Sequence, residues 1–391
     1  MYRDKINDLL LFKNKHFIKV ITGVRRCGKS TLLNLLGDNF KQEKNSNVIY
    51  INFEEYKYQY ITDKELYELL KKQIKPKTYL LLDEIQRVEK WELVINSLFA
   101  EYNDIDIYIT GSNAYLLSSE LSTYLAGRYI EIKLLPLSFK EFVEFNKFEV
   151  NKKTFNLYIQ YGGMPSLLNF YTKKESDVIL DGITSSIIMK DNFERVQIKD
   201  AKTLKKIILF LSDNIGNITS INNIKNILNN ETTRENKHAT TVENYITALK
   251  NAFLFYEVDR YDVKGKDILK SQSKYYIVDV GIRNFLLGKN ADNGRILENI
   301  VYLELIRRGY RVYIGKINNV EIDFVAEKDG ITTYFQVCET MLGEETKERE
   351  LKPLKIIKDN YDKVVLSMDE IFTGDNEGIK CKNIIEWLME E

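Results

Sequence analysis

The chain has 391 residues, of which 44% are hydrophobic, 12% aromatic and 29% charged. This composition excludes long disordered segments, and the length predicts roughly two or three folded domains. Lys plus Arg and Asp plus Glu each number 57, so the formal net charge of zero excludes a basic footprint over the whole protein, of the kind that points to nucleic acid.

Cysteines and apolar runs bear on the compartment. Cys27, Cys338 and Cys381 are too scattered for a metal site or a disulfide framework, which favours a reducing cytosol. The apolar stretch 9–12 is too short for a signal-peptide core, and no run has the length of a membrane helix. We therefore expect a cytoplasmic protein without a membrane partner.

A phosphate-binding motif lies between the first two predicted elements, a strand over 17–22 and a helix over 31–36 that Gly37 closes. Residues 23–30 fit the pattern G-x-x-x-x-G-K-[ST], whose glycines let backbone N–H groups converge on phosphates at a helix N-terminus. The motif implies a nucleoside triphosphate, with Lys29 at the β- and γ-phosphates. The predicted nucleotide-binding residues are Gly23, Val24, Arg25, Arg26, Cys27, Gly28, Lys29, Ser30, Thr31 and Asp83.

Two adjacent acids end a buried strand further along the chain. A strand over 48–53 and a helix over 63–72 precede the apolar run 79–82, which leads into Asp83 and Glu84. Ligands bind outside the carboxyl ends of parallel strands. We therefore expect Asp83 to hold Mg²⁺ together with Ser30, and Glu84 to polarise the attacking water as the general base.

The next two predicted strands add further candidates. The strand over 105–110 ends in Gly111-Ser112-Asn113, where Ser112 or Asn113 would hydrogen-bond the γ-phosphate or orient the water. Arg128 precedes a strand over 129–134. Three roles for Arg128 stay open: an arginine finger for a neighbouring subunit of a homo-oligomer, a phosphate contact in its own chain, or a structural salt bridge.

These motifs, together with the runs 80–86 and 136–139, resemble prokaryotic AAA-superfamily ATPases. The resemblance implies ATP and Mg²⁺ as ligands and a C-terminal domain of unknown function that is similar to restriction endonucleases. The later stretches that carry the resemblance are 161–165, 279–283, 297–299 and 321–324.

The middle of the chain predicts helices. Helical spacing from about residue 141 to the 191 region suggests a lid beside the nucleotide. Helices over 203–211, 221–228 and 242–253, followed by strands over 254–258 and 274–279, suggest a winged helix that contacts DNA or serves as a packing module. The basic residues near its third helix and putative wing are Arg234, Lys237, His238, Arg260, Lys264, Lys266 and Lys270.

The C-terminal segments predict the order α-β-β-β-α-β of the restriction-endonuclease core, with helices over 295–308 and 350–360. Nucleases of this kind need acids around a cation and a lysine near the attacking water. Glu298 and Asp323 could supply two acids, but Gln336 and Cys338 replace the expected acid and lysine. We therefore expect an inactive nuclease fold, unless Lys347 substitutes for the lysine.

The predicted fold is α/β: a P-loop parallel sheet over 1–140, a helical lid over 141–195, a winged-helix-like domain over 196–285 and a restriction-endonuclease-like domain over 286–391. The predicted function is Mg²⁺-dependent ATP hydrolysis that drives or gates rearrangement of the C-terminal domains, on DNA or a protein partner. One alternative is an ATP-gated binding module with little turnover, and the third and weakest is an Mg²⁺-dependent nuclease.

Overall fold

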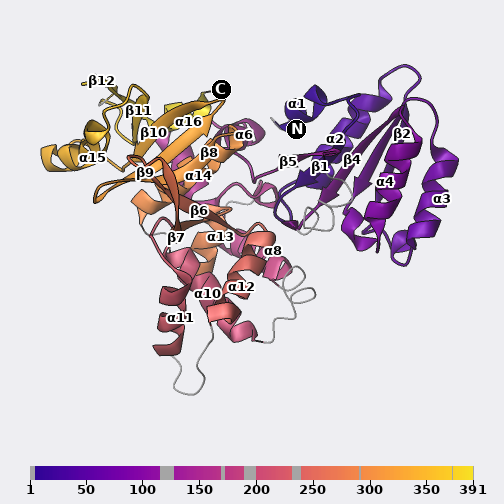
Figure 1. Ribbon diagram of the computed structural model, residues 1–391, viewed down its shortest axis with the longest axis horizontal. Coiled ribbons are helices and arrows are strands. Elements are labelled where there is room, and N and C mark those ends of the chain that lie inside the picture. Colours follow the sequence, from indigo (N-terminus) through magenta and orange to yellow (C-terminus); the bar gives the residue numbers. More distant parts are fainter. Residues whose placement is uncertain are drawn as a thin grey trace. The chain divides into compact units, whose positions relative to one another are not determined.

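A computed structural model describes residues 5–114, 127–168, 172–188, 200–230, 239–289, 292–371 and 373–390. The chain divides into two units, residues 1–136 with 251–253, and residues 137–250 with 254–391. Each unit has its own sheet (Figure 1).

Parallel strands form the sheet of the first unit, which is indigo to purple in Figure 1. Its strands are β1 (Ile18–Thr22), β2 (Asn47–Asn52), β3 (Thr78–Asp83), β4 (Ile105–Gly111) and β5 (Tyr129–Lys133). Its helices are α1 (Lys5–Leu11), α2 (Lys29–Lys41), α3 (Asp63–Gln73) and α4 (Trp91–Glu101). The strand order β2-β3-β4-β1-β5, with every pairing parallel, agrees with the α/β fold predicted for this part of the chain.

Strand β3 shows why the sheet forms from continuous apolar runs. Leu80 and Leu82 are fully buried in the hydrophobic cluster that includes α3 and α4. Tyr79 alternates with them and stacks on Phe40 of α2, with ring centroids 4.1 Å apart. A strand with helices on both faces has no polar side to expose, so it reads as an unbroken apolar run.

Helix α2 differs from its prediction. Gly37 does not end the helix, which continues to Lys41. A Cβ at residue 37 would lie 2.9 Å from Leu81 Cδ1, so the glycine allows α2 to pack closely on β3. The sequence pattern resembled a helix stop, but the residue serves a contact between a helix and the sheet.

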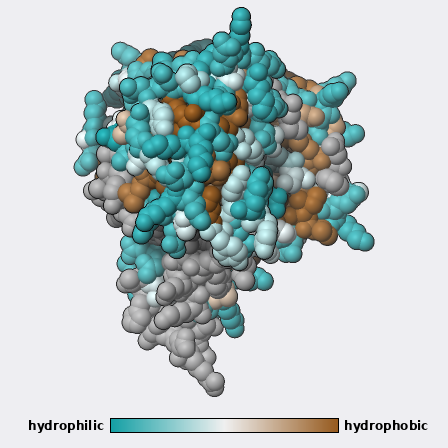
Figure 2. Space-filling view, turned by 90° about the vertical axis from the view of Figure 1, so that its right-hand side faces the viewer, coloured by the Kyte–Doolittle hydropathy of each residue, from teal (hydrophilic) through white to brown (hydrophobic). Residues whose placement is uncertain are grey.

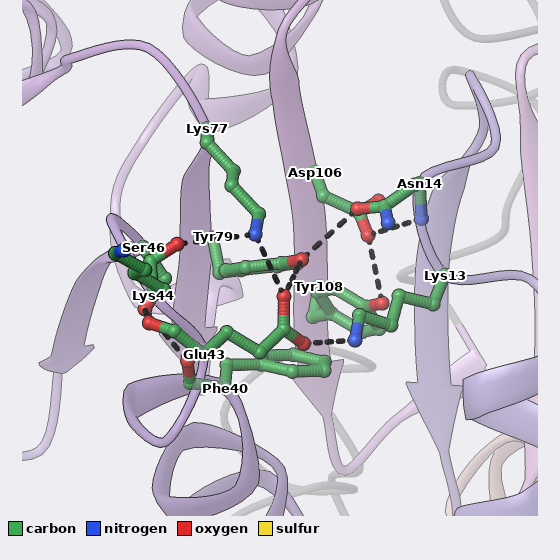
Figure 3. Close-up of polar contacts among 10 residues, drawn as sticks. All are labelled: Lys13, Asn14, Phe40, Glu43, Lys44, Ser46, Lys77, Tyr79, Asp106 and Tyr108. Atoms are coloured by element: carbon green, nitrogen blue, oxygen red, sulfur yellow. Dashed lines mark hydrogen bonds and ion pairs between the residues drawn. The ribbon is translucent and has the colours of Figure 1, made fainter.

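Polar side chains form a partly buried network at the amino end of this sheet (Figure 3). Lys19 of β1 forms an ion pair with Asp106 of β4. Glu43, beyond the end of α2, accepts hydrogen bonds from the Tyr79 hydroxyl and the Lys77 ammonium, at 3.0 and 3.1 Å. Burial raises the pKa of Tyr79 and lowers that of Lys19. The network fixes the end of α2 that is remote from the phosphate-binding motif.

The second unit combines helices with a mixed sheet. Its helices are α6 (Phe139–Asn146), α7 (Lys152–Tyr161), α8 (Lys173–Ile188), α10 (Ala201–Asp213), α11 (Ile221–Asn230), α12 (Ala239–Asn251), α13 (Val280–Leu287), α14 (Asn293–Arg307), α15 (Glu344–Ile356) and α16 (Ile384–Met389). Its strands are β6 (Phe255–Asp262), β7 (Asp267–Ile277), β8 (Arg311–Ile317), β9 (Val320–Lys328), β10 (Ile331–Val337), β11 (Asp362–Ser367), β12 (Gly374–Asn376) and β13 (Ile379–Asn383). The strand order is β12-β13-β11-β10-β9-β8-β6-β7.

The hairpin β6–β7 follows α10, α11 and α12, which is the predicted order of three helices and two strands. Thr219, between α10 and α11, also forms a bridge with Ser273 of β7. Strand β6 pairs in parallel with β8, so the hairpin and the C-terminal strands share one sheet. The predicted boundary between residues 285 and 286 therefore does not separate two sheets.

Two of the stretches that carried the family resemblance meet in the second unit. The Asp279 carboxylate accepts a hydrogen bond from the Gly163 N–H at 2.7 Å, and another from the Ile282 N–H at 3.0 Å at the start of α13. A Cβ on Gly281 would lie 2.0 Å from the Tyr161 carbonyl oxygen. These motif residues therefore join α7 to α13.

The surface shown in Figure 2 is mixed, with hydrophobic patches separated by hydrophilic residues. Within the described ranges, no helix combines the length and apolarity that crossing a membrane would require.

Candidate nucleotide-binding site

The loop between β1 and α2 adopts backbone angles that need its glycines. Gly28, the N-cap of α2, has φ 101°. Gly23 has φ 150°, and a Cβ there would lie 2.2 Å from the Leu134 carbonyl oxygen. Conformations of this kind favour glycine, so the glycines of the motif are required by the loop itself.

The other loop residues divide into buried and accessible ones. Val24 and Cys27 are fully buried. Arg25 is half-buried, while Arg26 and Thr31 are exposed. Burial explains why the Cys27 position is filled by a small apolar side chain, and it leaves the arginines on the accessible side of the loop.

Lys29 lies inside the loop. Its ammonium donates hydrogen bonds to the carbonyl oxygens of Gly23 and Val24, at 3.0 and 3.1 Å. The same nitrogen is 3.8 Å from Glu84 Oε1. The loop thus brings the predicted phosphate-binding cation beside the predicted general base.

Asp83 is fully buried at the carboxyl end of β3. Its Oδ1 accepts from the Thr110 hydroxyl at 2.6 Å, and its Oδ2 accepts from the Tyr50 hydroxyl at 3.2 Å. Burial raises the pKa of Asp83 above its ordinary value, and hydrogen bonds from Thr110 and Ser30 oppose that shift. The carboxylate is therefore fixed by hydroxyl donors.

The oxygen donors fit Mg²⁺. The Ser30 hydroxyl is close enough to the Asp83 carboxylate to lower the pKa of that acid, so the two predicted metal ligands are adjacent. Across the described residues, no group of three or more His, Cys, Asp and Glu side chains is placed to hold a metal. One carboxylate, one hydroxyl and substrate phosphates suit Mg²⁺, which commonly keeps several waters and is not bound by an all-protein cage.

Glu84 has an unusual backbone for a glutamate. Its φ and ψ are 56° and 44°, in the left-handed region, which costs about 1–3 kcal/mol for a residue with a side chain. Its carboxylate accepts from Gln86 Nε2 at 2.5 Å and from the Ser112 hydroxyl at 3.2 Å. The acid is thus turned out of the strand direction and held in place.

The residues after β4 are Ser112 and Asn113. Both are buried. Ser112 contacts Glu84, as described above, whereas the predicted contact of Asn113 with a γ-phosphate or water stays a prediction.

Comparison with known proteins places the chain in a family. Residues 15–143 match a family model described as "AAA domain", and residues 152–293 match "Domain of unknown function (DUF8612)". An uncharacterized protein of Haemophilus influenzae is 41% identical over 396 residues, covering 98% of this chain and 97% of the relative. The chain belongs to the same family as this protein. An uncharacterized protein of Methanocaldococcus jannaschii is 36% identical over 395 residues, covering 95% of this chain and 85% of that one.

Solved structures give a weaker likeness. The Aeropyrum pernix ORC2 protein has a TM-score of 0.40 at 11% identity, with 77% of this chain and 92% of that chain covered. The Aeropyrum pernix ORC1 protein, solved in complex with DNA, has a TM-score of 0.34 at 12% identity, with 73% and 92% covered. A shared fold over the whole chain does not follow from TM-scores at this level.

Arg128 lies away from the loop in its own chain. It immediately precedes β5, and its backbone carbonyl accepts from the Ile18 N–H at the amino end of β1. The phosphate-binding loop follows the carboxyl end of β1, which has five residues and so spans about 16 Å. The Arg128 side chain is exposed and donates to Asn96 of α4. A phosphate contact within its own chain does not fit this position.

The acids considered for a nuclease site have other partners. Glu298 accepts from Lys274 of β7 at 2.9 Å, and Asp323 accepts from the Val337 N–H at 2.8 Å. The Gln336 amide donates to Glu350 at 3.0 Å. Burial raises the pKa of the Cys338 thiol, which keeps it protonated. Positions 336 and 338 themselves therefore carry neither the expected acid nor the expected lysine.

Lys347 is not the lysine beside these acids. It lies 3.9 Å from Glu344, while Lys274 lies 2.9 Å from Glu298 and 2.6 Å from Glu321. The prediction overlooked Lys274 because the residue belongs to a different strand, which only the shared sheet brings close.

The structure describes only some of the basic residues that were predicted to contact DNA. Arg234, Lys237 and His238, and the side chain of Lys270, lie outside the described residues. Lys264 and Lys266 are exposed at the turn of the β6–β7 hairpin, and Arg260 is half-buried.

Three residues of the site are absent from the sequence-based prediction. Thr110 and Tyr50 bind Asp83, and Gln86 binds Glu84. Thr110 could have been predicted, because it ends the predicted strand directly before the Gly111-Ser112-Asn113 turn. Neighbouring parallel strands end at the same edge of a sheet, which places Thr110 near Asp83. Tyr50 gave no local signal.

Proposed function

We propose that this chain binds ATP with Mg²⁺ at the loop of residues 23–30 and hydrolyses it. The observation that carries the proposal is the proximity of Lys29, Ser30, Asp83 and Glu84 at the carboxyl ends of strands. We further propose that the hydrolysis cycle changes the arrangement of the C-terminal elements, on DNA or on a protein partner.

Each residue has a distinct proposed role. Lys29 neutralises charge on the β- and γ-phosphates, and Ser30 with Asp83 holds the metal ion. Mg²⁺ supplies charge neutralisation at the transferring phosphoryl group. Glu84 accepts a proton from the attacking water, and Gln86 and Ser112 keep its carboxylate oriented.

Nucleotide binding is tested with Lys29→Ala. Removing the ammonium should weaken binding of a fluorescent ATP analogue at least about tenfold, because a phosphate loses its charged donor. Lys64→Ala removes an exposed lysine of α3 in the same unit and should leave affinity unchanged. Equal affinities for the Lys29 variant and the wild type would contradict the assignment of the loop.

A second candidate function is an ATP-gated binding module with little turnover. It is favoured by the contacts of Glu84, whose carboxylate already has Gln86 and Ser112 as donors and lies near Lys29. An acid engaged in this way is slow to accept a proton unless the contacts loosen. ATP turnover below the uncertainty of a sensitive phosphate assay, with tight ATP binding, would select this alternative.

DNA as the partner is supported by the helix and hairpin order of the second unit and by exposed Lys264 and Lys266. Asp262 and Asp267 flank those lysines, so the local charge is balanced. Measurement of duplex DNA affinity against salt, with and without ATP, decides between partners. If the protein contacts DNA phosphates, the logarithm of the binding constant falls as the logarithm of the salt concentration rises. If no DNA binds, a protein is the remaining candidate partner.

A further inference from the structure

One hydroxyl group lies between the two acids of the site. Thr110, the penultimate residue of β4, is fully buried. Its Oγ1 donates to Asp83 Oδ1 at 2.6 Å and accepts from the Glu84 backbone N–H at 2.9 Å. Strands β3 and β4 are parallel neighbours with Leu82 opposite Ile109, which brings Thr110 level with the acids.

We propose that Thr110 is the positioning residue that orients both Asp83 and Glu84, so that one holds the metal and the other serves as the base. The inference rests on the proposed function and extends it to a residue outside the phosphate-binding motif. A hydroxyl has one proton to donate. Because Asp83 takes that proton, the oxygen can only accept from Glu84, so the direction of both hydrogen bonds is fixed.

The bond to Glu84 bears on the shape of its backbone. Glu84 directly follows β3 in a left-handed conformation, with φ 56°. Thr110 satisfies the N–H of the residue in this conformation. Successive side chains of a strand would point to opposite faces. The left-handed turn instead lets the Glu84 carboxylate reach Ser112 and come within 3.8 Å of Lys29.

The bond to Asp83 restricts how its carboxylate can turn. Thr110 occupies Oδ1, and the Tyr50 hydroxyl lies 3.2 Å from Oδ2. The two donors come from strands on either side of β3, since the order is β2-β3-β4. The carboxylate is therefore clamped across the sheet by Thr110 and Tyr50.

Thr110→Val tests the proposal, because valine keeps the branched shape and removes the hydroxyl. We expect kcat to fall about 100-fold, the size of effect that a misplaced catalytic group produces. The affinity for a fluorescent ATP analogue without metal should stay within about threefold, since Lys29 is untouched. The affinity for Mn²⁺ with a non-hydrolysable ATP analogue, read by electron paramagnetic resonance, should fall about tenfold, as for a lost carboxylate orientation.

Thr78→Val is the matched control. Thr78 is a buried threonine at the opposite end of β3, where its hydroxyl donates to the Lys75 carbonyl at 2.7 Å. Its loss should lower thermal stability and leave kcat and Mn²⁺ affinity near wild type. If Thr110→Val behaves like Thr78→Val, Thr110 is only structural and the proposal is overturned.

Thr110→Ser and Thr110→Ala form a second pair, which keeps the test open if the valine variant does not fold. Both lose the γ-methyl group and differ only in the hydroxyl. We expect serine to retain turnover within about fivefold and alanine to lose about 100-fold. Equal turnover of the two variants would overturn the role of the hydroxyl.

The experiments distinguish a failure of the proposed ATP hydrolysis from a failure of the proposed role of Thr110. A wild-type protein that binds nucleotide and Mn²⁺ without hydrolysis overturns ATP hydrolysis, and Mn²⁺ affinity then decides the role of Thr110. Weaker Mn²⁺ binding in Thr110→Val would support orientation of Asp83, whereas unchanged binding would overturn it. An active wild type with an equally active Thr110→Val overturns the positioning role alone.

Discussion

Lys19 is a charged residue near the amino end of the buried strand β1. Its side chain is fully buried, and its ammonium pairs with Asp106 and donates to the Lys15 carbonyl at 2.7 Å. Asp106 also accepts from the Tyr108 hydroxyl at 2.9 Å (Figure 3). Two buried charges of opposite sign are tolerated only while both are present.

Lys19→Met should therefore destabilise the first unit by about 3–5 kcal/mol in urea unfolding, because Asp106 is left buried without its cation. Adding Asp106→Leu should recover most of the loss, since two apolar side chains replace the pair. If Lys19→Met alone is as stable as the wild type, the ion pair does not stabilise the amino end of the sheet.

At the scale of elements, the junction of α7 and α13 is set by close backbone approach. A Cβ on Gly281 would lie 2.0 Å from the Tyr161 carbonyl oxygen, and one on Gly163 would lie 2.3 Å from the Leu137 carbonyl oxygen. Backbone atoms cannot move aside as the end of a side chain can. The glycines therefore determine how closely these segments pack.

Gly281→Ala should destabilise the second unit by about 1–3 kcal/mol or more, because the added methyl group overpacks a backbone contact. Gly294→Ala is the matched control, since Gly294 lies in helix α14 with nothing within 4 Å of the added Cβ. The control should be neutral or stabilising by up to about 1 kcal/mol. Thermal unfolding of the two variants checks this, and equal melting temperatures would contradict the account of the junction.

Local pattern was sufficient for the strands of the first unit. Strands β1, β3 and β4 begin and end within one residue of their prediction, because burial on both faces makes them apolar throughout. Helices α4 and α13 were not predicted, and Gly37 was taken as a helix end. In the last case the deciding contact, with Leu81, comes from a strand that is distant in sequence.

The sequence predicted the motif residues of the candidate site, but not the residues that hydrogen-bond to them. The sequence spacing predicted Lys29, Ser30, Asp83 and Glu84, whose proposed roles require fixed residue types, and the structure brings them close together. Thr110, Tyr50 and Gln86 were not found. The bonds of Thr110 and Tyr50 to Asp83 depend on the strand order, which no local pattern encodes.

At the scale of the whole molecule, Arg128 bears on assembly. It lies at the amino edge of the sheet, at the opposite end of β1 from its own Lys29. If Arg128 contributes to hydrolysis, the phosphate it contacts belongs to a second copy of the chain. A role of Arg128 in hydrolysis therefore predicts a homo-oligomer, whereas its hydrogen bond to Asn96 fits the structural role that the sequence left open.

Mixing two inactive variants tests this prediction. Arg128→Ala retains Lys29 but lacks the arginine, whereas Lys29→Ala retains the arginine but lacks a working loop. Each alone should show little turnover, and their mixture should regain turnover that rises with protein concentration. No recovery in the mixture, or full activity of Arg128→Ala alone, would contradict action between subunits.

The central claim is that Glu84 serves as the base in ATP hydrolysis, and turnover of Glu84→Gln tests it most directly. Glu68→Gln makes the same chemical change at an exposed position of α3 and serves as the control. We predict that Glu84→Gln binds ATP with wild-type affinity and hydrolyses it at least about 100-fold more slowly than the wild type. Glu68→Gln should hydrolyse ATP at the wild-type rate. Equal turnover of Glu84→Gln and the wild type would contradict the account.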